Sequence, residues 1–109
     1  MTLVEFKSLL SNAKEQITGT ACKRAIETMT EKIEKKVLAG EQVELMLITH
    51  NKTGVVYLLC NAAAAERNKF VCVSLNGEET KLYSKSTLMS MFSVQLQQFQ
   101  QVKEMDYYD

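Results

Sequence analysis

Apolar residues in the N-terminal part of the chain recur at the spacing of two amphipathic helices. Steps of three and four positions, the period of an α-helix, separate Leu3, Phe6, Leu10, Ala13 and Ile17. The same steps separate Cys22, Ile26, Met29, Ile33 and Val37, and Ala25 lies on the same stripe. Thr2 and Glu5 match a capping box at the start of the first pattern, and Gly40 can end the second. The sequence therefore predicts one helix over about residues 3–17 and another between Thr20 and Gly40.

The middle of the chain is apolar in short runs that are typical of buried strands. Val43–His50 and Gly54–Asn61 flank a polar turn that ends in Gly54, and together they predict a β-hairpin. The alanine-rich residues 61–68 connect this hairpin to a third predicted strand, Lys69–Leu75. Asn76-Gly77 is a turn signal, and it leads to a weaker fourth strand over Glu79–Ser84.

The C-terminal part predicts a third helix over about Ser86–Met105. Its buried stripe comprises Leu88, Met91, Phe92, Leu96, Phe99 and Val102. The predicted fold class is α+β, with two N-terminal helices, an antiparallel sheet of three to four strands and a C-terminal helix. A chain of 109 residues has room for one core, so we expect a single domain over residues 1–109. Within it, residues 104–109 are expected to form a flexible acidic and aromatic tail.

Both faces of the first two predicted strands carry apolar residues, so both faces need to be covered. Three helices cover such a sheet incompletely. An uncovered apolar face on a small protein is typically an interaction surface. The sequence therefore predicts a homodimer or a constitutive protein partner.

Composition narrows the possible functions and the compartment. The chain has 13 basic and 13 acidic residues, and this neutral balance argues against nucleic-acid binding driven by overall charge. No apolar run approaches the length of a membrane span, so no membrane association is expected. Cys22, Cys60 and Cys72 form an odd set without CxxC spacing, which disfavours a disulfide framework or a zinc site. With no N-terminal signal sequence in evidence, we expect a reducing, cytoplasmic location.

No residue pattern indicates catalysis. His50 is the only histidine, and nothing nearby in sequence offers the orienting partner that a catalytic imidazole needs. The acidic residues lie in turns or on a helix flank, and no glycine-rich phosphate-binding motif is present. We therefore expect no enzymatic activity, no cofactor and no metal.

The best candidates for protein contact lie on the predicted third helix and in the tail. Glutamine is neutral and easier to desolvate than lysine or glutamate, so a glutamine-rich face tolerates burial against a partner. Simple solvent exposure of the glutamines and fraying of the tail are the alternatives. The candidate partner-binding residues are Gln97, Gln98, Gln101, Tyr107 and Tyr108.

The best candidate for an anionic partner is one flank of the second predicted helix. Basic residues gather there, and glutamates occupy the opposite flank, so a merely solvated helix is the alternative interpretation. Binding to a nucleic-acid backbone needs several such charges on one surface. The candidate residues on this flank are Arg24, Lys32, Lys35 and Lys36, and Lys85 is expected to extend the same basic patch.

A topological resemblance bears on this second possibility. From Thr20 onward the predicted order helix–strand–strand–strand–helix resembles a double-stranded RNA-binding domain, and Ser84-Lys85-Ser86 resembles the basic helix start of that family. The resemblance implies phosphate contacts at Lys85.

Two function hypotheses follow. The first is a small intracellular protein-binding regulator or accessory protein, of the type that viruses and mobile elements encode, without catalysis. The second is a nucleic-acid-binding module.

Overall fold

The computed structural model describes residues 1–60 and 69–98. Within these residues it contains three helices and five strands. In chain order they are α1 (Leu3–Gln16), α2 (Thr20–Leu38), β1 (Glu44–His50), β2 (Val56–Leu59), β3 (Lys69–Ser74), β4 (Thr80–Ser84), α3 (Lys85–Met91) and β5 (Phe92–Gln98). The predicted α+β class, the two N-terminal helices and the first four strands are confirmed.

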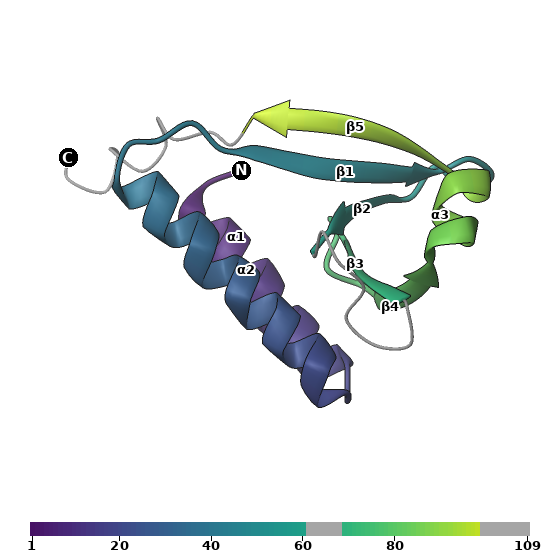
Figure 1. The fold of residues 1–109 in the computed structure, drawn as a ribbon, viewed down its shortest axis with the longest axis horizontal. Coiled ribbons are helices and arrows are strands. Elements are labelled where there is room, and N and C mark those ends of the chain that lie inside the picture. The colour runs from purple at the N-terminus through teal and green to yellow at the C-terminus, as the bar shows by residue number, and fades with distance from the viewer. Residues whose placement is uncertain (61–68, 99–109) are drawn as a thin grey trace.

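The two N-terminal helices begin and end where the sequence places the signals. Thr2 caps α1, because its hydroxyl oxygen accepts a hydrogen bond of 3.1 Å from the backbone N–H of Glu5. Beyond the end of α2, Gly40 adopts a φ of 77°, which side-chain-bearing residues rarely take. The two helices run antiparallel and pack together (Figure 1).

The five strands form one antiparallel sheet in the order β4-β3-β2-β1-β5. Side chains of one sheet face join α1 and α2 in the main core, since alternate residues of each strand point the same way. The strand residues of this core are Leu45, Leu47, Leu58, Val71 and Val73, and Cys60, directly after β2, joins them. At the far end of α1, Gln16 accepts a hydrogen bond of 2.6 Å from the hydroxyl of Thr80 and donates one of 3.0 Å to the carbonyl of Gly77. The helix pair is thereby fixed to the β3–β4 turn.

The opposite face of the sheet carries a second, smaller core. Its buried members are Ile48, Tyr57, Cys72 and Phe92. Leu88 of α3 packs against them, so α3 covers part of this face. The helix also joins the two edge strands β4 and β5 directly. Its seven residues span about 10 Å, whereas the edges of a flat five-stranded sheet are about 19 Å apart. The sheet must therefore curl around the second core, as Figure 1 shows.

The predicted C-terminal helix over about Ser86–Met105 is confirmed for residues 86–91 and is wrong for residues 92–98. The helix ends at Met91, and Phe92–Gln98 forms the fifth strand. Phe92, Val94 and Leu96 are spaced by two, which is the strand period. β1 supplies an otherwise unpaired edge, and all seven residues of β5 pair with it. Long-range pairing therefore decides between two local patterns. The predicted connection over 61–68 and the tail over 104–109 lie outside the described residues.

In the part of the chain that the structure describes, no helix is both long and apolar enough to cross a membrane.

Candidate functional site

β5 is an edge strand without the features that normally protect such an edge. It pairs with β1 on one side only, so among the described residues its outer backbone groups meet no other strand. Natural proteins commonly place charged residues or proline on exposed edges to prevent pairing with other chains. Residues 86–102 contain neither a charged side chain nor a proline. Neither charge nor proline on this edge would therefore prevent another strand from pairing with it.

An exposed apolar strip runs beside this edge. The register places Val94 opposite Ile48 and Leu96 opposite Met46, so these side chains share the sheet face of the second core. Met46, Val94 and Leu96 are 40%, 63% and 56% exposed, and we call these three residues the β5 strip. Exposed apolar residues that are contiguous on one surface are typical of an interaction site.

The predicted partner-binding residues fall partly on this strand. Gln97 lies on the face opposite the β5 strip, with its side chain exposed, and Gln98 is the last residue of β5. Gln101, Tyr107 and Tyr108 lie outside the described residues. None of the three residues of the β5 strip was predicted as a contact residue, and Leu96 was expected to be buried. The alternation in Phe92–Gln98 and its lack of charge were the signals for an open strand.

The start of β5 is fixed firmly to the β1–β2 turn. The backbone N–H of Asn51 donates to the carbonyl of Met91 at 2.9 Å, and the Ser93 hydroxyl donates to the Asn51 side-chain oxygen at 2.8 Å. The ring of His50 meets Phe92 edge-on, with centroids 5.0 Å apart. His50 Nδ1 also accepts from the backbone N–H groups of Lys52 and Thr53, at 3.2 and 3.3 Å. His50 therefore has a structural role in holding the turn.

The basic flank of α2 is exposed at Arg24, Lys32 and Lys35 and half-buried at Lys36. On the opposite flank, Glu34 pairs with Lys7 of α1 at 2.6 Å and Glu27 pairs with Lys14 at 3.8 Å. Lys7, Lys14 and Glu27 line an open groove between the helices, together with Glu31, which forms no ion pair within the described residues. Arg24, Lys32, Lys35 and Lys36 lie on the basic flank.

Lys85 does not join that flank, because it begins α3, which lies on the far side of the molecule from α2 (Figure 1). Nucleic-acid binding by the α2 flank stays a prediction. A salt titration of binding to duplex RNA tests it, since phosphate contacts weaken steeply with salt.

The three cysteines offer no reactive site. Cys22, Cys60 and Cys72 are buried, and burial raises the pKa of the Cys72 thiol to about 12 and also raises that of Cys60. A protonated, buried thiol is a poor nucleophile and a poor metal ligand. Over residues 1–60 and 69–98, no cluster of His, Cys, Asp and Glu could hold a metal ion.

No protein-family model matches this chain, and neither a curated protein nor a solved structure matches it significantly. Its function must therefore be inferred from its own residues.

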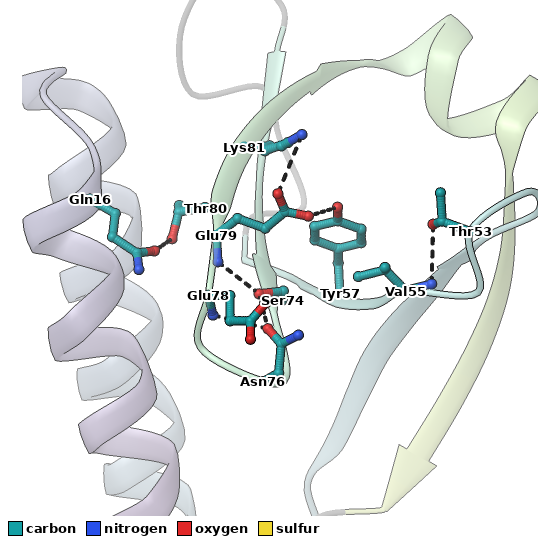
Figure 2. Close-up of polar contacts among 10 residues, drawn as sticks. All are labelled: Gln16, Thr53, Val55, Tyr57, Ser74, Asn76, Glu78, Glu79, Thr80 and Lys81. Atoms are coloured by element: carbon teal, nitrogen blue, oxygen red, sulfur yellow. Dashed lines mark hydrogen bonds and ion pairs between the residues drawn. The ribbon is translucent and has the colours of Figure 1, made fainter.

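A polar cluster around Tyr57 closes the second core at the β3–β4 end (Figure 2). The buried Tyr57 hydroxyl donates a short hydrogen bond to the Glu79 carboxylate, which also lies 3.4 Å from Lys81. The Ser74 hydroxyl accepts from the Glu79 N–H at 3.0 Å and donates to Asn76 at 2.7 Å. The Tyr57 hydroxyl, the Glu79 carboxylate and the Ser74 hydroxyl each have a partner, and Tyr57 is only 3% exposed. The cluster therefore stabilises the β3–β4 turn.

This cluster predicts a specific acid sensitivity. The Tyr57 hydroxyl, and then Lys81, hold the pKa of Glu79 below its ordinary value of 4.5. A lowered pKa in the folded state means that the charged carboxylate stabilises the fold above that value and loses the contribution as pH falls. We expect Glu79→Gln to show a smaller loss of stability than the wild type between pH 5 and 3, measured by urea denaturation.

Glu78→Gln is the matched control, because Glu78 is an adjacent carboxylate that forms no hydrogen bond or ion pair with the described residues. It should follow the wild-type pH dependence. Parallel curves for the wild type and Glu79→Gln would contradict a role for Glu79.

Proposed function

We propose that this chain is a protein-binding module without catalytic activity and that β5 is its contact surface. The observation that carries the proposal is an uncharged edge strand beside the exposed β5 strip. A strand added to such an edge gains main-chain hydrogen bonds, and its alternate side chains gain apolar contacts.

The firm anchoring of β5 supports this proposal. The contacts of Asn51 with Met91 and Ser93 fix the start of the strand, and its pairing with β1 extends over all seven residues. A partner strand would meet a preformed edge, so little conformational entropy would be lost on this side of the interface.

We further propose that the protein acts in the cytoplasm as a regulator or accessory factor. The three buried cysteines form no disulfide, which fits a reducing compartment. The burial of its thiols and the structural role of His50 favour action through contact with another protein.

The test compares Leu96→Asp with Val4→Asp in capture from cells that naturally produce the protein. Both side chains are 56% exposed, but Leu96 belongs to the β5 strip and Val4 lies on α1. A carboxylate on the strip would have to be desolvated on binding, which costs several kcal/mol. We expect tagged Leu96→Asp to capture less than about a tenth of the protein that the wild type captures. Untagged copies of this chain count as captured protein.

Val4→Asp should capture as much protein as the wild type, and circular dichroism should show both variants folded. Equal capture by the two variants would contradict β5 as the contact surface.

A further inference from the structure

We propose that the occupant of the β5 edge is a second copy of this chain, whose own β5 pairs antiparallel across a two-fold axis. This inference rests on the proposed function and names its partner. Figure 1 places β5 at the margin of the molecule, away from α1 and α2, so the helices do not obstruct its outer edge.

The spacing of apolar residues along β5 is self-complementary. An antiparallel pair centred on Gln95 places Val94 directly opposite the partner's Leu96, and Leu96 opposite the partner's Val94. Residues directly opposite in an antiparallel pair share a sheet face, so the two β5 strips merge into one apolar surface. The seven residues of β5 form an edge about 24 Å long. Pairing along it would join two five-stranded sheets into a continuous ten-stranded one.

The polar residues of β5 also favour a copy of the same strand. A glutamine amide carries both a donor and an acceptor, so Gln95 can bond to its own symmetry mate, whereas a charged side chain there would meet a like charge. Ser93 would meet the partner's Gln97, again a neutral pair that can hydrogen-bond. The chain as a whole has 13 basic and 13 acidic residues, so two copies carry no net repulsion. An edge without charge is suited to a neutral strand such as itself.

A charge-swap experiment at the symmetry axis tests the proposal. The wild type, Gln95→Lys and Gln95→Glu are measured by light scattering after size exclusion, at about 100 µM, a concentration that populates dimers of micromolar Kd. We expect a wild-type dimer and at least about tenfold weaker association in each single variant, because two like charges directly opposite are destabilising. An equimolar mixture of the two variants should restore the dimer mass, since opposite charges then meet.

Ser8→Lys is the control for added charge, because Ser8 is exposed on α1. It should remain dimeric. A monomeric wild type, or single variants that dimerise as the wild type does, would overturn the second-copy proposal, as would a mixture that stays monomeric while the wild type dimerises.

The failure of this inference is distinguishable from the failure of the proposed function. A monomeric wild type together with loss of a foreign protein in Leu96→Asp would overturn only the second copy. Equal capture by Leu96→Asp and Val4→Asp would overturn the contact surface itself.

Discussion

Phe92→Ala should lower the free energy of unfolding by about 3–5 kcal/mol, the usual cost of removing a buried phenylalanine. Phe92 is 6% exposed and lies at the centre of the second core. Its ring centroid is 5.0 Å from those of His50 and Tyr83 and 5.9 Å from that of Tyr57. Domains of this size are stable by only about 5–15 kcal/mol, so the urea midpoint should fall markedly.

Val94→Ala is the matched control for this variant. Val94 is the next residue on the same face of β5, but it is 63% exposed. Truncation there should cost less than about 1 kcal/mol, because little buried surface is lost. Similar losses in the two variants would contradict the placement of Phe92 in a core and of Val94 on the surface.

Phe6→Ala should cost about 3–5 kcal/mol as well, because it opens a cavity in the main core. Phe6 of α1 is fully buried in the main core, which α2 and the sheet complete. The variant tests whether the helix pair covers that sheet face. Urea denaturation followed by circular dichroism measures it.

Val4→Ala, on the exposed side of the same helix, is the control for Phe6→Ala. It should change stability by less than about 0.5 kcal/mol. A loss below about 1 kcal/mol in Phe6→Ala would contradict a packed core between α1 and the sheet.

The sequence predicts the helices and the first four strands because their patterns are local and unambiguous. In α1 the apolar steps of three and four fit only a helix, and Thr2 caps it as expected. In the hairpin over residues 43–60, the two-sided apolar runs fit only buried strands. The structure shows what covers them: the helix pair on one face and a second core, partly under α3, on the other.

The error over residues 92–98 has a different origin. Leu88, Phe92 and Leu96 satisfy the helical spacing, while Phe92, Val94 and Leu96 satisfy the strand spacing. Pairing with β1, more than forty positions away, decides the outcome for 92–98, and a local pattern does not contain that information.

The candidate contact surface was predictable only in part. The neutral glutamines indicated a contact surface in this segment, but they were expected on the face of a helix and not on a strand. The β5 strip depends on the register with β1, which brings Met46 beside Leu96. The helices were expected to leave part of an apolar sheet face uncovered. The β5 strip is such a part, since its three residues are exposed in the described structure.

Photo-cross-linking in the cell directly tests whether the β5 edge binds protein. A benzophenone amino acid is placed at Gln97, exposed on β5, or at Ser8, exposed on α1. We predict a discrete protein adduct from the Gln97 position and none from the Ser8 position. The adduct mass would show whether the occupant is a second copy. No adduct at Gln97, or equal adducts at both positions, would contradict binding of protein at this edge.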